Sequence, residues 1–210
     1  MTRILVVDDH PLVRRGIIEV IAGEWRGGTI GEASTAAEAL AAIWDQSWDL
    51  VLLDISLPGR SGLDVLKEIK VARPKLPVLV LSIFPESQFA IRVLRAGAVG
   101  YLTKESPPET LLKAVRQCLS GGKYITPSLA ETLASQVSGD TSKPPHELLS
   151  DREYDVMLRI AAGESVSHVA TALNLSVKTV STYRSRILLK MGLENNAQLS
   201  QYSIRNNLIS

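Results

Sequence analysis

The sequence contains a single cysteine, Cys118, so no internal disulfide framework can stabilise the fold. A lone thiol suits a reducing compartment, and we therefore expect a cytoplasmic protein. No apolar run approaches the ~20 residues that a membrane-spanning helix needs. The N-terminus enters a short strand-like run with no cleavage site, so it does not resemble a signal peptide. These absences argue against a disulfide-stapled secreted domain, and they predict no membrane partner.

The chain also carries little net charge. Its 210 residues have a formal net charge of +1 and are 45% hydrophobic, which is ordinary for a globular protein. The charge is unevenly spread, because residues 176–210 hold five basic side chains against one acidic and so carry +4, leaving −3 for the rest. A locally basic end weakly indicates a polyanionic partner, although solvated basic helix faces are common.

Short apolar runs alternate with amphipathic stretches over residues 3–119. The expected strands cover 4–7, 29–34, 50–53, 78–81 and 100–102. The expected helices cover 12–22, 36–46, 62–72, 87–96 and 107–119. Strands that alternate with helices at this spacing predict an α/β fold, with a five-stranded parallel, doubly wound sheet covered on both faces.

Residues 121–148 change character. They contain a Gly-Gly turn, one expected short helix over 127–137, and then a segment with Gly, Ser, Lys and a Pro-Pro pair, which is typical of a linker. The sequence therefore predicts a first domain over 1–120, a linker with a short helix over 121–148, and a second domain over 149–210.

The second domain has no strand pattern and is expected to be a small all-α bundle of four short helices. Ser150 and Glu153 fit a capping box, which starts its first helix. Ser176 is the expected N-cap of a longer helix that ends at Gly192.

Polar side chains follow four of the five expected strands. They are Asp8 and Asp9 after the first strand, Asp54 after the third, Ser82 after the fourth and Lys104 after the fifth. Ligands of open parallel sheets bind at the carboxyl ends of the strands, so we expect these side chains to meet. Three carboxylates repel one another unless a cation lies among them, and Mg²⁺ prefers such oxygen ligands. With an ammonium and a hydroxyl for phosphoryl oxygens, the set predicts phosphoryl transfer onto a carboxylate.

Each of these residues also has a plain structural explanation. Adjacent aspartates after a strand often cap the next helix, and Pro11 is compatible with that role. An aspartate before a turn is commonly a turn residue. The prediction depends on the joint occurrence of the set at successive strand ends.

The segments "ILVVDDHPLVRRG", "DLVLLDISLPGRSGLDVL", "VLVLS" and "RAGAVGYLTK" resemble, in order and spacing, the receiver domain of two-component response regulators. The resemblance implies a flavodoxin-like fold in which Asp54 accepts a phosphoryl group from a sensor histidine kinase. The implied Mg²⁺ ligands are Asp8, Asp9, Asp54 and the backbone carbonyl of Ser56. The residues implied to bind the phosphoryl group or to switch in response to it are Ser82, Lys104 and Tyr101.

Glu105 and His10 are sequence neighbours of this set. Glu105 follows Lys104 where many receivers have proline, so the resemblance leaves open whether that peptide bond is cis, a form that costs about 3–4 kcal/mol without proline. His10 lies beside the acid pair, and we interpret it as a helix-start residue rather than a metal ligand.

The stretch "HVATALNLSVKTVSTYRSRILLKMG" has the layout of a helix-turn-helix. Its second helix combines an apolar inner face with an outer face that bears, at helical spacing, Lys178, Ser181, Thr182, Ser185 and Arg186. Arginine can read guanine, Ser or Thr can meet base edges, and Lys178, Arg184 and Lys190 suit phosphates. The alternative is a helical protein-interaction bundle with a solvated basic face.

The whole segment "LLSDREYDVMLRIAAGESVSHVATALNLSVKTVSTYRSRILLKMGLENNAQL" resembles the LuxR-type (NarL/FixJ) DNA-binding domain. It departs from the usual pattern on the scaffold helix, where "SVSHVA" lacks a Lys and a Glu, and at Tyr183, where many members have His. The implied DNA-binding residues are Lys178, Thr179, Ser181, Thr182, Tyr183, Arg184, Ser185, Arg186 and Lys190.

Together these features predict a bacterial response regulator. Phosphorylation of Asp54 would control homodimerisation and the binding of double-stranded promoter DNA, with RNA polymerase as a further candidate partner and no substrate turnover of its own. One alternative is a regulator that binds DNA constitutively and never uses its receiver pocket. A second is a Mg²⁺-dependent phosphatase with an aspartyl-phosphate intermediate, although such enzymes typically place the nucleophile after their first strand.

Overall fold

The computed structural model describes residues 1–58, 60–138 and 144–209. The chain divides into two compact units, Met1–Leu133 and Ala134–Ser210, called here the N-terminal unit and the C-terminal unit. In the described ranges, no helix is both long enough and apolar enough to cross a membrane.

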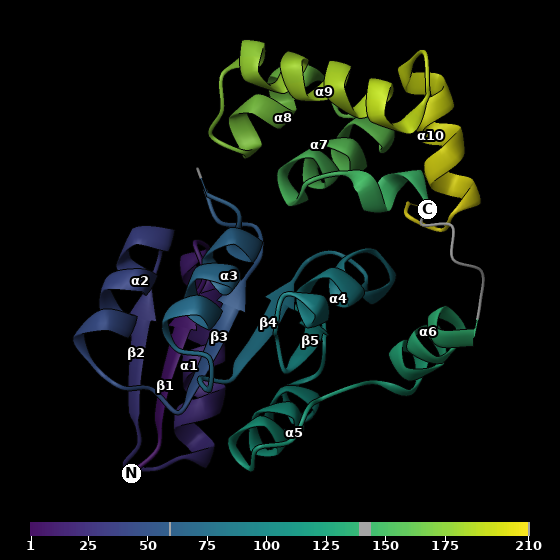
Figure 1. Cartoon of the computed structure of the whole chain (residues 1–210). Coiled ribbons are helices and arrows are strands. Elements are labelled where there is room, and N and C mark those ends of the chain that lie inside the picture. The colour runs from purple at the N-terminus through teal and green to yellow at the C-terminus, as the bar shows by residue number, and fades with distance from the viewer. Residues whose placement is uncertain (59, 139–143, 210) are drawn as a thin grey trace. The chain divides into compact units, whose positions relative to one another are not determined.

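The N-terminal unit contains a parallel sheet with the order β2-β1-β3-β4-β5 (Figure 1). The strands are β1 (Arg3–Val7), β2 (Thr29–Ala33), β3 (Leu50–Asp54), β4 (Val78–Ser82) and β5 (Gly100–Thr103). The register pairs Val7 with Leu53, so the residues that follow them, Asp8 and Asp54, lie at the same edge. The register of β4 and β5 pairs Ser82 with Thr103, one residue before Lys104.

Five helices connect the strands, and the alternation expected from the sequence is confirmed. They are α1 (Pro11–Glu24), α2 (Ala36–Asp45), α3 (Gly62–Ala72), α4 (Glu86–Arg95) and α5 (Pro108–Leu119). Side-chain caps start two of them: Thr35 accepts from the backbone N–H of Glu38 in α2, and Ser61 accepts from that of Leu63 in α3.

The core of this unit has a layer on each face of the sheet. On one face, Leu52 and Leu79 belong to a buried cluster with Ile21 of α1 and Ala114 of α5. The alternate residues along the strands face the other side, where α2, α3 and α4 contact the sheet. The three central strands are therefore continuous apolar runs, as a sheet buried on both faces requires.

The segment after α5 packs on the same unit. The backbone N–H of Tyr124 donates to the carbonyl of Val99 at 2.8 Å, and Tyr124 forms an isolated parallel bridge with Gly100. The next helix, α6 (Pro127–Ser138), buries Leu129. The expected linker over 121–148 therefore begins with a docked piece, and its residues 139–143 lie outside the described residues.

The C-terminal unit is helical. It contains the short 3-10 helix η1 (Pro145–Leu148), then α7 (Asp151–Ala161), α8 (Val166–Ala172), α9 (Val177–Met191) and α10 (Asn196–Arg205). Helix α7 packs against α8, α9 and α10. The sequence pattern did not indicate η1, because Pro145 and the preceding N-cap residue Pro144 were interpreted as linker residues.

The caps expected in this unit are present. Ser150 and Glu153 form both bonds of a capping box at the start of α7. Ser176 caps α9, and Gly192 ends that helix in the left-handed conformation with φ 65°. These caps fix where the second helix of the helix-turn-helix begins and ends.

Candidate functional site

The strand-end residues of the N-terminal unit meet in one buried pocket. The Nζ atom of Lys104 lies 2.7 Å from Oδ2 of Asp8 and 2.7 Å from Oδ2 of Asp54. Asp8 and Asp54 are each 1% exposed, and Ser82 is fully buried. One ammonium therefore holds two buried carboxylates side by side at the carboxyl edge of the sheet.

Backbone groups fix the second oxygen of Asp54. Its Oδ1 accepts the backbone N–H of Ser56 at 2.9 Å. Behind it, a Cβ at position 62 would lie 2.1 Å from the carbonyl oxygen of Asp54, so only glycine fits there. The turn after β3 thus lies directly against the start of α3, with no room for a side chain between them.

The acid pair is shaped by the start of α1. The backbone N–H of His10 donates to Oδ1 of Asp8 at 2.8 Å, and the guanidinium of Arg14 donates to the carbonyl oxygen of Asp8 at 2.6 Å. Nδ1 of His10 lies 2.8 Å from Oδ1 of Asp9. His10 is the N-cap residue of α1, as expected of a helix-start residue, but its side chain does not form the cap.

This group of side chains can hold a metal ion. One ligand atom each from Asp8, Asp9, His10 and Asp54 lies within 4.8 Å of the others. Oδ1 of Asp9 is buried and accepts no hydrogen bond within the described part of the chain, although Nδ1 of His10 lies 2.8 Å away and pairs with it when the imidazole is protonated. Hard carboxylate oxygens this close together fit a divalent cation such as Mg²⁺.

Burial and pairing set the charge states in the pocket. Burial raises the pKa of the Asp54 carboxyl, and the neighbouring Lys104 ammonium only partly offsets that rise. Burial alone would lower the pKa of Lys104, but the charges of Asp54 and Asp8 outweigh it and raise the pKa overall. The raised pKa favours the charged form of Lys104, which pairs with both carboxylates.

The two predicted switch residues hold the same peptide segment. Oγ of Ser82 accepts the backbone N–H of Phe84 at 3.1 Å, and the hydroxyl of Tyr101 donates to the carbonyl oxygen of Phe84 at 2.7 Å. The Tyr101 ring is 1% exposed and therefore already lies inside the unit. The loop between β4 and α4 is thus bonded to the pocket residue Ser82 and, through Tyr101, to β5.

Sequence reasoning missed three contributors to this pocket: Arg14, Gly62 and Phe84. Their roles depend on backbone atoms, and only Gly62, directly after a capping serine, carries a sequence signal. The described part of the chain contains no cis peptide bond, so Lys104 and Glu105 are joined in trans.

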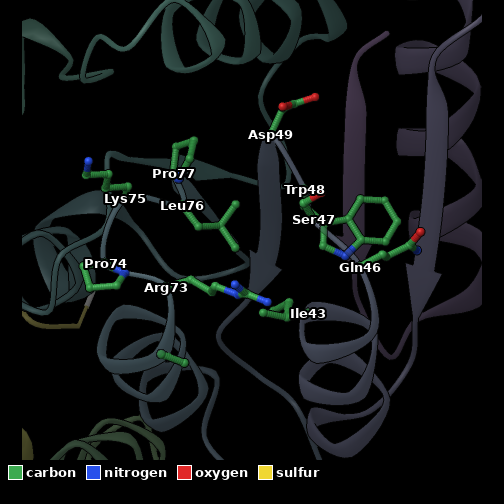
Figure 2. A pocket seen from close by; sticks show the side chains of 11 residues that line it. Ile43, Gln46, Ser47, Trp48, Asp49, Arg73, Pro74, Lys75, Leu76 and Pro77 are labelled. Carbon is green, nitrogen blue, oxygen red and sulfur yellow. The ribbon is translucent and has the colours of Figure 1, made fainter.

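A cavity of about 610 Å³ lies at the opposite edge of the sheet, around the N-terminal ends of β3 and β4. Figure 2 shows Gln46 and Trp48 on one side of it, across from Pro74 and Lys75. None of the predicted site residues lines this cavity, so size alone does not locate the chemistry.

Helix α9 presents the two faces expected from the sequence. Val180 and Ile187 are buried against the rest of the C-terminal unit. The exposed side chains on the outer face include Lys178, Ser181, Thr182, Ser185 and Arg186. Thr182 and Ser185 donate their hydroxyl protons to backbone carbonyls one turn earlier, which leaves their oxygens as acceptors.

Four other predicted DNA-binding residues are less free. Arg184 donates to Oδ1 of Asn196 at 2.6 Å, and Nζ of Lys190 lies 2.6 Å from Oε2 of Glu153 in the capping box of α7. Thr179 and Tyr183 are half-buried. The bonds of Arg184 and Lys190 position α9 against α10 and α7.

Comparisons with known proteins agree with this architecture. The family described as the response regulator receiver domain matches residues 4–116, and the luxR family of bacterial regulatory proteins matches residues 147–203. Response regulator UvrY of Escherichia coli K12 is 34% identical over 209 residues, covering 99% of this chain and 96% of that protein. Response regulator GacA of Pseudomonas aeruginosa is 34% identical over 210 residues, covering 100% and 98%.

Among solved structures, RcsB from Salmonella enterica serovar Typhimurium, bound to promoter rprA in the presence of phosphomimetic BeF3-, is 26% identical with a TM-score of 0.63. The match covers 96% of this chain and 98% of that one. Two matched domains and relatives aligned over nearly their whole length leave one assignment. The chain is a response regulator of the NarL/FixJ family, with a receiver domain and a LuxR-type DNA-binding domain.

Proposed function

We propose that Asp54 accepts a phosphoryl group from a sensor histidine kinase and that this event controls promoter binding by α9. The observation that carries the proposal is the contact of one ammonium, Nζ of Lys104, with the carboxylates of both Asp8 and Asp54 at 2.7 Å. This arrangement supplies a nucleophile and a fixed positive charge in a pocket that excludes most water.

In the proposed transfer, a carboxylate oxygen of Asp54 bonds to phosphorus while the phosphorus–nitrogen bond of the kinase phosphohistidine breaks. The histidine nitrogen leaves with the electron pair of that bond. With a proton on one ring nitrogen, the released histidine side chain is a neutral imidazole. Lys104 is placed to pair with one phosphoryl oxygen, and the Ser82 hydroxyl is placed to donate to another. Asp8, Asp9, Asp54 and the carbonyl of Ser56 would hold Mg²⁺, which would supply neutralising charge to the carboxylates and the phosphoryl group.

The signal would leave the pocket through Ser82. If its hydroxyl turns to a phosphoryl oxygen, the backbone N–H of Phe84 loses its acceptor. The carbonyl of the same residue stays bonded to Tyr101. The loop before α4 then loses one of the bonds that hold it, which gives a local electrostatic change a structural consequence.

We propose the outer face of α9 as the DNA-binding surface. Arg186 would read a base edge, with Ser181, Thr182 and Ser185 nearby, and Lys178 would meet a phosphate. Thr179, Tyr183, Arg184 and Lys190 complete the proposed set, the last two through the bonds that orient α9. A homodimer would place two such helices on a two-fold symmetric DNA site. The protein would contact RNA polymerase at the promoter.

The proposed domain limits are 1–120 for the receiver and 149–210 for the DNA-binding domain, with 121–148 as the connecting segment. We further propose that the protein works in the cytoplasm and turns over no substrate of its own.

The test is phosphoryl labelling of the full chain by acetyl phosphate with Mg²⁺, read as intact mass. Wild type should gain one acid-labile phosphoryl group, and Asp54→Asn should gain none. Asp45→Asn, at the end of α2, is the matched control and should label like wild type. Stoichiometric labelling of Asp54→Asn would overturn the proposal.

A further inference from the structure

We propose that the cavity at the C-terminal ends of α2 and α3 binds a small aromatic carboxylate, with the guanidinium of Arg73 as the partner of the anion. The residues that line it come from the ends of these two helices and from the loops that follow them. The cavity lies at the opposite edge of the sheet from the acidic pocket. The proposal is therefore independent of phosphorylation at Asp54.

The cavity has the size and the walls of a small-molecule site. Its volume is about 610 Å³, and such sites typically measure roughly 300–1,000 Å³. Its lining is mainly apolar, with Ile43 and Trp48 on one side and Pro74, Leu76 and Pro77 on the other (Figure 2). The flat indole and pyrrolidine surfaces suit a planar ring, whose removal from water the hydrophobic effect favours.

Contacts on its other sides hold the Trp48 ring in place as one wall of the cavity. Its Nε1 donates to the carbonyl oxygen of Ala42 at 2.9 Å, and the guanidinium carbon of Arg3 lies 5.7 Å from the ring centroid. A Cβ at position 31 would lie 2.3 Å from Cη2 of the indole, so the ring packs directly against Gly31. Because its polar group is bonded and its far edge is packed, Trp48 provides a preformed apolar surface.

Arg73 supplies an uncommitted cation at this cavity. Its side chain is exposed, and Figure 2 shows its guanidinium reaching across the cavity towards Ile43. Within the described residues, the side chain of Arg73 makes neither an ion pair nor a hydrogen bond. A guanidinium presents a planar fork of donors that matches the two oxygens of a carboxylate. Arg73 can therefore bind an anionic group while the rest of the ligand lies on the apolar walls.

Acceptors beside the cavity already have other donors. In the loop after α3, the carbonyls of Pro74 and Leu76 accept from Nζ of Lys70 at 3.0 and 2.7 Å. Asp49 is the acidic residue among the lining side chains, and its Oδ2 accepts a backbone N–H of β1 at 2.8 Å. Figure 2 shows the Asp49 carboxylate pointing away from Arg73. These acceptors therefore do not neutralise the guanidinium, which leaves its donors to a ligand.

The charges of the lining predict the selectivity of the site. Arg73 and Lys75 are two cations against the single carboxylate of Asp49. This balance favours an anion over a neutral molecule of the same shape and disfavours a cation. A carboxylate can accept two parallel hydrogen bonds from one guanidinium, whereas a neutral amide cannot. An aromatic carboxylate should therefore bind more tightly than the corresponding carboxamide.

The experiment follows the indole N–H signals of the full chain by two-dimensional ¹H–¹⁵N NMR. The probes are naphthalene-2-carboxylate and its neutral match, naphthalene-2-carboxamide. The carboxylate should shift the Trp48 signal saturably, and the carboxamide should bind at least about fivefold more weakly because it lacks the charge. Trp25→Phe and Trp44→Phe identify the Trp48 signal, since these are the other two tryptophans of the chain.

Three variants locate the site. Arg73→Gln should weaken binding of the carboxylate at least about fivefold and leave that of the carboxamide unchanged. Lys113→Gln changes an exposed lysine of the same unit and is the matched control, so it should alter neither affinity. Ala72→Phe adds a ring at the cavity lining and should weaken binding of both probes.

Three results would overturn the inference. They are the absence of a saturable Trp48 shift at millimolar probe, equal affinity for the two probes, and wild-type affinity of Arg73→Gln for the carboxylate. Labelling of Asp54 by acetyl phosphate is a separate measurement, and its failure would overturn the proposed function instead.

Discussion

The hydroxyl of Tyr101 donates a hydrogen bond to the carbonyl oxygen of Phe84 at 2.7 Å. The N–H of the same residue, Phe84, donates to Oγ of Ser82 at 3.1 Å. One residue of the loop between β4 and α4 is therefore held by both members of the predicted switch pair, and each bond can be removed separately.

Removing the first bond should destabilise the N-terminal unit. Tyr101→Phe keeps the buried ring and leaves the Phe84 carbonyl without its donor, so we expect a loss of about 1 kcal/mol in the free energy of unfolding. Urea unfolding of the full chain measures it. Tyr183→Phe, on α9 of the other unit, is the control, and equal behaviour of the two variants would show that the Tyr101 bond contributes nothing.

Asp54 should cost stability at neutral pH. Because burial raises its pKa, the folded unit binds this proton more tightly than the unfolded chain does. The stabilisation that the protonated carboxyl contributes is therefore lost as the pH rises from the ordinary carboxyl pKa of about 4 through the raised pKa of the folded state. Asp54→Asn removes the buried charge and should raise the unfolding midpoint of the N-terminal unit by a few degrees at pH 7.

The same comparison at low pH supplies the check. Near pH 4 the advantage of Asp54→Asn over wild type should shrink, since the wild-type carboxyl is then protonated more often in both states. A midpoint for Asp54→Asn that lies below wild type at pH 7 would contradict the argument from burial.

Glu153 should behave in the opposite way. Burial raises the pKa of its carboxyl, but the bonds from Lys190 and Ser150 outweigh burial and lower the pKa overall. Its stabilisation is thus present above the ordinary glutamate pKa and is lost as the pH falls through the lowered folded value. Glu153→Gln should cost the C-terminal unit about 1–2 kcal/mol at pH 7 and progressively less at acid pH.

Thermal unfolding at neutral and acid pH tests this prediction. Glu194→Gln is the matched control, because Glu194 is an exposed glutamate of the same unit. A cost of Glu153→Gln that does not change with pH would mean that its ion pair with Lys190 contributes little.

Two exposed cations on α9 should weaken DNA binding in different ways. Lys178→Ala should weaken binding to all duplexes alike and reduce the slope of log affinity against log salt by about 1. Arg186→Ala should cost about 1–3 kcal/mol and relax the preference for one base. Fluorescence anisotropy over a range of salt concentrations separates the two effects. Lys113→Ala, an exposed lysine of the N-terminal unit, should change neither quantity.

Thr126 should stabilise the first turn of α6. Its Oγ1 lies 2.7 Å from both carboxylate oxygens of Glu86 and accepts the backbone N–H of Leu129 at 3.1 Å. Thr126→Val loses both bonds and should cost about 1 kcal/mol locally, seen as faster hydrogen exchange in the first turn of α6. Unchanged exchange, matching that of the exposed Ser128→Ala control, would contradict this role.

The fold and the centre of the pocket could be predicted from the sequence because both follow from local pattern. Short apolar runs predicted the five strands and amphipathic stretches predicted their helices, and parallel topology brings residues at successive strand ends together. That topology predicts that Lys104 lies near Asp8 and Asp54, and the structure shows its ammonium in contact with both carboxylates.

Other features depend on contacts between distant residues and could not be read from a pattern. The sequence indicates that Lys190 and Arg184 are basic and on α9, but only the fold brings them to Glu153 and Asn196. Likewise Arg14 donates to the backbone carbonyl of Asp8, a contact that residue types alone do not predict.

The affinity of the full chain for a duplex selected from a random pool, measured with and without acetyl phosphate and Mg²⁺, tests the central claim most directly. We predict that the phosphodonor tightens binding by wild type and leaves Asp54→Asn unchanged. Equal affinity of wild type under both conditions, or equal tightening by Asp54→Asn, would contradict control of DNA binding through Asp54.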